Sequence, residues 1–278
     1  MSAATVSLDT TIKFRLLTPE TGAEVFDIDL SKDATPEVIS DIQHLLVTYG
    51  AVFFRDQVLS RDQHRDLGSQ FGNLHIHPAA PAPEGYPEIL VIHADASHKG
   101  TAPLHWHSDV SCDPEPPAAS MLYLRTVPDV GGDTMFSNMY LAYDALSEPM
   151  KKYLDGMTAI HAGDTYRSGF YKTEAEGGKV PVSEHPVVRT HPVTGRKALF
   201  VNPGFTRQLN GLLRRESAEL LRFLFDHVND PHFICRFNWQ PNSIAFWDNR
   251  CVQHYPIDDY FPALRTGDRI TIAGDRPF

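Results

Sequence analysis

A histidine and an aspartate two positions apart are the first residues in this chain that could do chemistry. They are His107 and Asp109, in the segment LHWHSDV at residues 104–110. On a strand, residues i and i+2 project to the same face, so this imidazole and carboxylate could bind one metal ion together. A third ligand would come from a distant strand, and His254, which follows the apolar run 244–247, is the candidate. Two histidines and one carboxylate leave three coordination positions open, an arrangement typical of Fe(II) oxygenases.

The histidine–aspartate spacing is a weak signal by itself, because such a pair also arises by chance on a surface strand. His105 is a competing ligand, but it would crowd a site that already holds His107 and Asp109, so a place beside the metal or the substrate suits it better. A zinc or manganese hydrolase or isomerase could use the same three ligands and remains an alternative. Zinc hydrolases, however, usually keep one open coordination position rather than three.

Two arginines follow the third predicted ligand. Arg265 lies eleven residues after His254, and Arg269 lies four residues further on. A guanidinium offers a planar fork of donors that matches a carboxylate, such as the distal carboxylate of an iron-bound 2-oxoglutarate. Strand alternation lets Arg269 reach the same cavity. Taken singly, either arginine could be a solvated surface charge, so this interpretation depends on the metal ligands.

Composition limits the classes to which the chain can belong. Its 278 residues are 42% hydrophobic and 22% charged, which is typical of a soluble globular protein, and we expect one domain over 1–278. The net charge of -10 disfavours nucleic acid as a partner. The N-terminus shows no basic leader, and no run is apolar and long enough to span a membrane. Three cysteines without a CxxC pair predict reduced thiols and a cytoplasmic protein.

Helical patterns occur at several places along the chain. From Thr35 to Tyr49, a capping threonine, a proline in the first turn and an apolar stripe predict a helix that Gly50 ends. Ser60 and Gln63 form a capping-box signature for a second helix, which we expect to end near residue 72. Further helices are predicted at about 139–145, 148–154 and 216–228.

Short strand-like runs, separated by proline and glycine turns, dominate the rest of the chain. The run at 51–54 predicts a buried strand, and the others lie at 88–93, 118–124, 187–190, 198–201, 232–237, 243–247 and 269–273. Several short strands joined by turn-rich stretches of about 8–12 residues predict a sandwich or barrel. We therefore expect a mainly β chain with flanking helices, most simply a jelly roll.

Six segments between about Gly50 and the C-terminus carry a resemblance to a known family. They are, in order, FGNLHIHP, LHWHSDV, GGDTMFSN, EHPVVRTHPVTGRKALFVNPGF, WQPNSIAFWDNRCVQHY and RITIAGDRPF. In this order they resemble segments of the TauD/TfdA family of Fe(II)- and 2-oxoglutarate-dependent dioxygenases, the taurine dioxygenase type. Chance does not assemble such a series. The resemblance implies a double-stranded β-helix core, the cupin-like jelly roll.

The resemblance also implies roles for individual residues. His107, Asp109 and His254 match the iron ligands. Thr134, in the GGDT segment, matches a position whose hydroxyl helps to hold 2-oxoglutarate, although GGDT is also a simple turn sequence. Arg265 matches the arginine that pairs with the distal carboxylate of 2-oxoglutarate. The implied enzyme uses Fe(II), 2-oxoglutarate and O2 to hydroxylate an unactivated C–H bond, and it releases succinate and CO2.

The same resemblance implies a small anionic organic substrate. Arg269 matches the arginine that receives the sulfonate, and His77 matches a histidine of the same anion pocket. Phe205 matches an aromatic wall of the taurine site, although a plain core role fits it equally well. Where taurine enzymes carry a tyrosine and an asparagine, this chain has Ala80 and Pro103, which offer no side-chain hydrogen bond. Since each unpaired polar group costs roughly 1–3 kcal/mol, we expect an alkyl sulfonate, sulfate ester or carboxylate that is longer or less polar than taurine.

Two other functions stay open at this point. One is taurine dioxygenase itself, which releases sulfite, and the other is a non-catalytic module that binds 2-oxoglutarate or another small anion. The intact metal ligands argue against the module, because a pure binder needs no open iron site. The segment 163–178 is predicted to form a mobile lid. A homodimer or tetramer is suggested by the resemblance alone.

Overall fold

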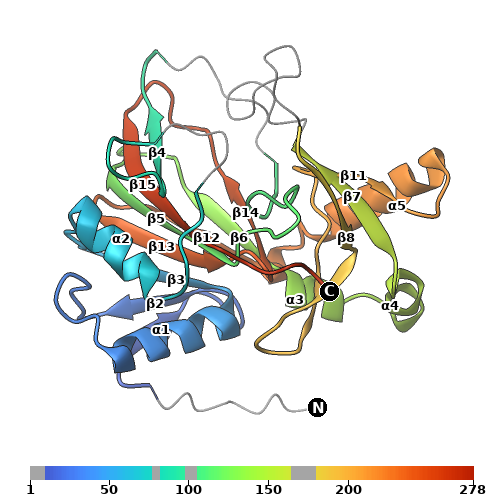
Figure 1. The fold of residues 1–278 in the computed structure, drawn as a ribbon, viewed down its shortest axis with the longest axis horizontal. Coiled ribbons are helices and arrows are strands. Elements are labelled where there is room, and N and C mark those ends of the chain that lie inside the picture. The colour runs from blue at the N-terminus through green and yellow to red at the C-terminus, as the bar shows by residue number, and fades with distance from the viewer. Residues whose placement is uncertain (1–9, 77–81, 98–104, 164–179) are drawn as a thin grey trace.

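The computed structural model describes residues 10–76, 82–97, 105–163 and 180–278. A seven-stranded sheet with the order β1-β2-β3-β13-β5-β15-β4 forms its largest layer (Figure 1). Neighbouring strands in it run antiparallel except for the parallel pair β2 and β3. The strands are β1 (Lys13–Leu16), β2 (Ala23–Phe26), β3 (Ala51–Phe54), β4 (Ile89–Ala94), β5 (Ala119–Thr126), β13 (Ser243–Asp248) and β15 (Arg265–Ile272).

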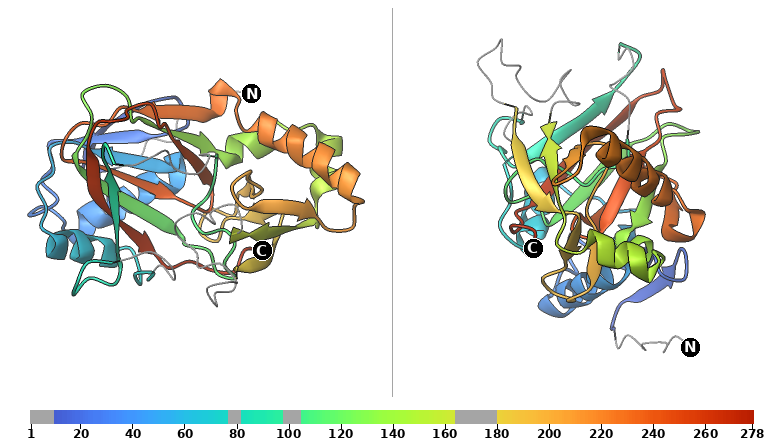
Figure 2. Two further views of the ribbon diagram at one scale, coloured as in Figure 1. Left: turned by 90° about the horizontal axis from the view of Figure 1, so that it is seen from above. Right: turned by 90° about the vertical axis from the view of Figure 1, so that its right-hand side faces the viewer.

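Three smaller sheets complete the strand structure of the described residues. The order β12-β6-β14 forms one, β11-β7-β8 a second, and β10-β9 a third. The molecule is elongated, with the large sheet towards one end and β7, β8 and β11 towards the other (Figure 2). The strands are β6 (Thr134–Asn138), β7 (Thr158–Ala162), β8 (Val182–Pro186), β9 (Val188–Thr190), β10 (Lys197–Leu199), β11 (Thr206–Leu209), β12 (Ile234–Phe237) and β14 (Val252–Pro256).

Five α-helices flank these sheets within the described residues. α1 begins after Thr35, whose side chain accepts the backbone N–H of Val38, and it ends at Gly50, whose φ of 75° is in the left-handed region that glycine favours. α2 begins with the predicted capping box of Ser60 and Gln63. α1 packs on β3 and β13, and α2 packs on β15. The helices are α1 (Pro36–Tyr49), α2 (Arg61–Ser69), α3 (Met139–Asp144), α4 (Glu148–Leu154) and α5 (Arg214–His227).

The large sheet is buried on both faces because its central strands alternate between two apolar clusters. On β13, Ile244 and Phe246 join the cluster beneath α1 and α2, whereas Ala245 and Trp247 join the cluster on the opposite face. This period of two is the strand period. The second cluster also contains Phe136 of β6, so it fills the space between the large sheet and the β12-β6-β14 sheet.

The structure confirms the predicted helices and strands to within a few residues at their ends. It adds strands that the sequence pattern did not predict, namely β1, β2, β6, β7, β8, β11 and β14. β6 is the most consequential of these. In the GGDTMFSN segment, residues 131–133 lie outside regular structure, with Gly131 and Gly132 at positive φ, and the strand begins at Thr134 and pairs with β12 and β14. No helix in the described ranges has the length and apolar character needed to cross a bilayer.

A buried histidine beneath the large sheet should make stability depend on pH. His64 of α2 is fully buried, with its ring 5.7 Å from that of Tyr123, and burial lowers the pKa of His64 to about 4. An unfolded histidine has a pKa of about 6.5, so the unfolded chain takes up the proton first as pH falls. The neutral ring therefore contributes fully above about pH 6.5, and up to about 3 kcal/mol is lost between pH 6.5 and 4.

Chemical denaturation of wild type and His64→Leu at pH 7, 6, 5 and 4 measures this effect. The leucine variant should lose less unfolding free energy across the series than the wild type does. Parallel curves for the two proteins would contradict the expectation.

Candidate metal centre

The structure brings the three predicted metal-binding side chains together. One ligand-type atom from each of His107, Asp109 and His254 lies within 4.8 Å of the other two. The Nε2 atom of His107 is 3.9 Å from Oδ1 of Asp109, and the two imidazole centroids are 4.1 Å apart. All three residues are at least nine-tenths buried. The two histidines also exchange backbone hydrogen bonds of 3.1 and 2.9 Å, which fixes the distance between their segments.

The expectation that the histidine–aspartate pair lies on one strand is wrong. His107 forms an isolated bridge to His254, whereas Asp109 lies in the turn that follows. Val110 has a φ of 48°, an uncommon left-handed conformation for a β-branched residue. The chain thus bends directly after Asp109, and this bend rather than strand alternation places the carboxylate beside the imidazoles. Gly204 lies against the same segment, since a Cβ added there would come within 2.8 Å of the His107 Cβ.

Both oxygens of the Asp109 carboxylate receive hydrogen bonds. Arg269 Nη1 donates to Oδ1 at 2.7 Å, and Ser120 Oγ donates to Oδ2 at 2.6 Å. The Asp109 backbone N–H donates to Oδ1 of Asn249 at 3.2 Å. Sequence analysis assigned Arg269 to the substrate anion, and the structure places its guanidinium on the carboxylate of the candidate metal site.

Charges at this centre favour the protonation states that bind metal. Burial alone would raise the pKa of Asp109, but the Arg269 charge, the two imidazoles and the Ser120 hydroxyl bring it well below its usual range. Burial lowers the pKa of His107, and burial together with its neighbour His107 lowers the pKa of His254 strongly. Since Nδ1 of His107 faces the carbonyl of His105 at 2.8 Å, its Nε2 is left with the lone pair. Neutral imidazoles and an ionised carboxylate are the ligands that a divalent cation requires.

A second set of predicted residues lies around Trp239. Its indole Nε1 donates to Thr134 Oγ1 at 3.0 Å, and the guanidinium of Arg265 lies 5.7 Å from its ring centroid. Arg265 is only 6% exposed, and burial lowers the pKa of its guanidinium, partly offset by Tyr260 and Asp258. No hydrogen bond or ion pair of Arg265 is found within the described ranges, and its Nε is buried without a partner. A buried cation of this kind fits an anionic ligand.

Strand register connects this group to the metal-type residues. Thr134 of β6 is opposite Pro256 of β14, and His254 lies two residues before Pro256. Side chains of Thr134 and His254 therefore emerge on the same face of the small sheet. Arg265 and Arg269 come from β15 of the large sheet, so the site lies where the two sheets face each other (Figure 1).

The remaining predicted residues divide into described and undescribed ones. Phe205 is buried, with its ring centroid 6.4 Å from that of His107 and in an apolar cluster with Val110. His105 is not part of the ligand-type group, and it contributes its backbone carbonyl to His107. His77, Ala80, Pro103 and the predicted lid, apart from residue 163, lie outside the described residues.

A second group of ligand-type residues, His191, Asp248 and Cys251, is better explained as a structural clamp. Nδ1 of His191 accepts the backbone N–H groups of residues 193 and 194, so its Nε2 carries the proton that it donates to Asp248 Oδ2 at 3.0 Å. Both ring nitrogens are thereby used. Arg250 donates to both oxygens of Asp248, at 2.9 and 2.7 Å. These bonds fix the turn that follows β13.

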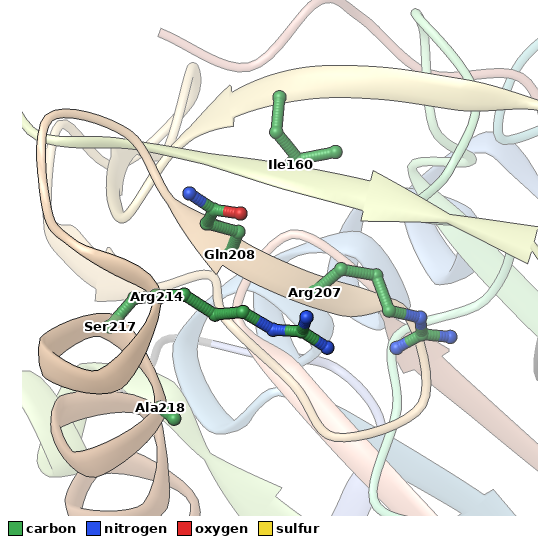
Figure 3. A pocket seen from close by; sticks show the side chains of 6 residues that line it. All are labelled: Ile160, Arg207, Gln208, Arg214, Ser217 and Ala218. Carbon is green, nitrogen blue, oxygen red and sulfur yellow. The ribbon is translucent and has the colours of Figure 1, made fainter.

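A surface pocket of about 540 Å³ is formed by a different set of residues. It is lined by Ile160, Arg207, Gln208, Arg214, Ser217 and Ala218, and Arg214 extends along β11 towards Arg207 (Figure 3). None of these six is a predicted site residue. Arg207 is already engaged there, because it donates to the backbone carbonyls of Ala162, Gly204 and Thr206.

Sequence analysis missed three residues that support the site: Ser120, Trp239 and Asn249. Trp239 and Asn249 do lie in the segment WQPNSIAFWDNRCVQHY, which was noted for its resemblance. Their hydrogen bonds to Thr134, Asp109 and Ser120, however, join residues about 100 to 140 positions apart along the chain. A sequence pattern gives no signal for a hydrogen bond between such distant positions.

Comparisons with known proteins agree with this geometry. The family model for "Taurine catabolism dioxygenase TauD, TfdA family" matches residues 13–271. An alpha-ketoglutarate-dependent sulfonate dioxygenase of Saccharomyces cerevisiae is 34% identical, over 96% of this chain and 68% of its own length. An alpha-ketoglutarate-dependent sulfate ester dioxygenase of Pseudomonas putida is 32% identical, over 92% of this chain and 87% of its own.

The solved structures include a taurine dioxygenase from Burkholderia xenovorans. It has a TM-score of 0.84 and 36% identity, and the alignment covers 96% of this chain and 90% of the other. The fold is therefore the expected mainly β, cupin-like jelly roll with flanking helices. Taken with the match over residues 13–271, this likeness shows that the chain belongs to the TauD/TfdA family of dioxygenases.

Proposed function

We propose that this chain hydroxylates an unactivated C–H bond of a small organic anion, using an iron ion held by His107, Asp109 and His254. Its family membership makes it a 2-oxoglutarate-dependent dioxygenase, an oxidoreductase. The observation that carries the proposed site is the buried grouping of two neutral imidazoles and one ionised carboxylate within 4.8 Å. This donor set suits Fe(II), and it leaves half of an octahedral sphere for 2-oxoglutarate and O2.

Iron with 2-oxoglutarate and O2 would supply the oxidising chemistry, with succinate and CO2 as co-products. The residues of the chain bind and orient the reactants. Arg265 would bind the distal carboxylate of 2-oxoglutarate, because its buried guanidinium forms no salt bridge in the described part of the chain. Thr134 would hold the same molecule through its hydroxyl, which is oriented by the indole N–H of Trp239. Each assignment places an anion beside a cation or a hydrogen-bond donor that is already buried there.

The substrate anion would bind to Arg269, next to the metal. Nη1 of Arg269 lies on Asp109, so an anion that engages the remaining donors of this guanidinium is held beside the reacting centre. Phe205 supplies an apolar surface beside His107, and His77 is proposed as a second contact to the anion. The relatives named for sulfonates and sulfate esters support a sulfur oxyanion.

A substrate longer or less polar than taurine remains the favoured choice. Ala80 and Pro103 stand where the taurine enzymes have hydrogen-bonding side chains, and an unpaired ammonium would lose roughly 1–3 kcal/mol for each missing bond. Taurine itself, with release of sulfite, is the alternative. A panel of substrates separates the two.

The test is substrate-stimulated succinate formation with taurine, alkyl sulfonates, alkyl sulfates, alkyl carboxylates and aryloxy carboxylates. We expect stimulation by a longer alkyl sulfonate or sulfate ester to exceed that by taurine at least about tenfold, as one lost hydrogen bond implies. Arg269→Gln should remove the stimulation. Arg222→Gln, at an exposed arginine of α5 that pairs with Glu219, is the matched control and should leave it unchanged.

The outcomes decide between the candidate functions. Best activity with taurine would identify a taurine dioxygenase, and no response to any sulfur oxyanion would refute the proposed anion site. Binding of 2-oxoglutarate without turnover of any compound would favour the non-catalytic module. Hydrolysis without consumption of 2-oxoglutarate would favour a zinc or manganese enzyme.

We propose further that the protein is cytoplasmic and forms a homodimer or tetramer. All three cysteines are buried, and an odd number of them without a CxxC pair is typical of a reducing compartment. The oligomeric state rests on the family resemblance, and light scattering coupled to size-exclusion chromatography measures it directly. A monomeric mass at micromolar concentration would refute that part of the proposal.

A further inference from the structure

Asn249 is a buried polar residue that contacts the candidate metal centre through two other side chains. It lies in the turn after β13 and is only 1% exposed. Its backbone N–H donates to the carbonyl of Ala118 at 2.8 Å. The neighbouring Asp248 is clamped by His191 and Arg250, so the turn is fixed from both sides. A side chain held so tightly is suited to orient other groups.

The orientation of the Asn249 amide is set by its partners. Its Oδ1 lies 3.2 Å from the backbone N of Asp109 and 3.0 Å from Nε1 of Trp247. Both of these groups are donors only, so the atom facing them must be the amide oxygen. The amide nitrogen Nδ2 therefore faces Ser120 Oγ, at 2.9 Å, and donates to it.

This orientation in turn directs the Ser120 proton. The hydroxyl has one proton, and its oxygen already accepts the Asn249 amide. Its other close partner is Oδ2 of Asp109, at 2.6 Å, which is ionised and can only accept. The proton must therefore point to Oδ2. A directed relay runs from Asn249 through Ser120 to the oxygen of Asp109 that lies away from Arg269.

The Asn249 side chain is also linked, through Trp247, to the β12-β6-β14 sheet. Trp247, whose indole N–H is held by Asn249, lies with its ring centroid 4.7 Å from that of His254. Asn249 is thus connected to Asp109 in two ways, through the backbone N–H and through Ser120, and to His254 through the tryptophan ring. It is thus linked, directly or through one neighbouring side chain, to two of the three candidate ligands.

We propose that Asn249 is a positioning residue that keeps Oδ2 of Asp109 engaged with Ser120, so that Asp109 offers only Oδ1 to the metal. This inference rests on the proposed iron site. Oδ1 is the oxygen nearer to His107, at 3.9 Å, and the one that Arg269 contacts. Hydrogen bonds to ligating carboxylates fix their geometry and tune the metal. Without the relay, Oδ2 is free to rotate towards the metal and to occupy a position that 2-oxoglutarate or O2 requires.

The test uses Co(II), whose d–d absorption bands report the coordination number without any turnover. The variants are Asn249→Leu, which keeps the approximate volume but removes both polar groups, and Ser120→Ala, which removes the hydroxyl alone. In each we expect the Kd for Co(II) to rise about 10- to 100-fold. We also expect the d–d absorption bands of bound Co(II) to change in the same direction in both variants. Asn138→Asp, at a buried asparagine that caps α3, is the matched control and should bind Co(II) as the wild type does.

The double variant distinguishes positioning from ordinary stabilisation. If Asn249 acts through Ser120, the loss in Co(II) affinity on combining the two substitutions is smaller than the product of the single losses. Equal Co(II) affinity and spectra in wild type and both single variants, even with lowered melting temperatures, would overturn the proposal. If the wild type itself binds no Co(II), the iron site fails instead, so the two failures are distinguishable.

Discussion

Replacement of His254 by alanine is expected to abolish succinate formation and to weaken metal binding by more than about 100-fold, since loss of a direct ligand should exceed the 10- to 100-fold typical of outer-shell partners. His254 lies on β14, and its backbone hydrogen bonds with His107 hold β14 beside the loop that carries Asp109. Its imidazole is neutral because burial lowers its pKa. Removing the ring leaves one imidazole and one carboxylate for the cation. Isothermal titration with Mn(II) measures the affinity, and succinate formation with the best substrate measures the activity.

His185→Ala is the control for this experiment. His185 is also a buried histidine, at 2% exposure, and its Nε2 contacts the backbone carbonyl of Asp113. Its truncation removes a ring of the same size, so it should lower stability to a similar extent while metal affinity stays within a few-fold of wild type. Equal losses of metal affinity in the two variants would show that His254 matters for packing and not as a ligand.

The second large effect is expected at Arg265. Arg265→Leu should raise the Kd for 2-oxoglutarate at least about 30-fold, because truncating one partner of a buried charge pair costs about 2–5 kcal/mol. The same substitution removes a buried guanidinium that forms no salt bridge within the described residues, so the unliganded protein should be as stable as wild type or more stable. The measurements are calorimetric titration of 2-oxoglutarate into the Mn(II)-loaded protein and thermal unfolding without ligands.

The two measurements should respond differently to Arg265→Leu: the affinity for 2-oxoglutarate falls, whereas the stability of the unliganded protein does not. Arg222→Gln provides the matched control, because this exposed arginine of α5 pairs with the equally exposed Glu219 on the protein surface. It should change neither quantity appreciably. If Arg265→Leu instead destabilises the chain and leaves 2-oxoglutarate binding unchanged, the guanidinium is structural and the proposed cofactor contact is wrong.

Local signals predicted much of the fold correctly. The Thr35 cap with Gly50, and the capping box of Ser60 and Gln63, predicted the beginnings of α1 and α2 and the end of α1 because these contacts lie within a few residues of one another. Strands that are apolar on both faces, such as β3, were also evident. β8, a strand of mixed burial, was not, because nothing in its local pattern signals its pairing with β7, 20 or more residues earlier in the chain.

The candidate site likewise combines features that the sequence predicts with features that depend on distant contacts. His107, Asp109 and His254 could be selected because metal-binding chemistry restricts residue types, and their proximity is what the structure adds. The turn at Val110 that positions Asp109 could not be predicted, since a positive φ at valine runs against its intrinsic preference and is imposed by tertiary contacts. The contact of Arg269 with Asp109 could not be predicted either, because the two residues are 160 positions apart in the sequence.

The proposed enzyme binds one metal ion through two imidazoles and one carboxylate and leaves the rest of the coordination sphere to small molecules. A crystal structure of the protein with Mn(II) and 2-oxoglutarate, prepared without oxygen, would show this arrangement. We expect one ion bound by His107, by a single oxygen of Asp109 and by His254, with 2-oxoglutarate chelating the ion and extending to Arg265. A fourth protein ligand such as His105, or an ion bound by other residues, would contradict it.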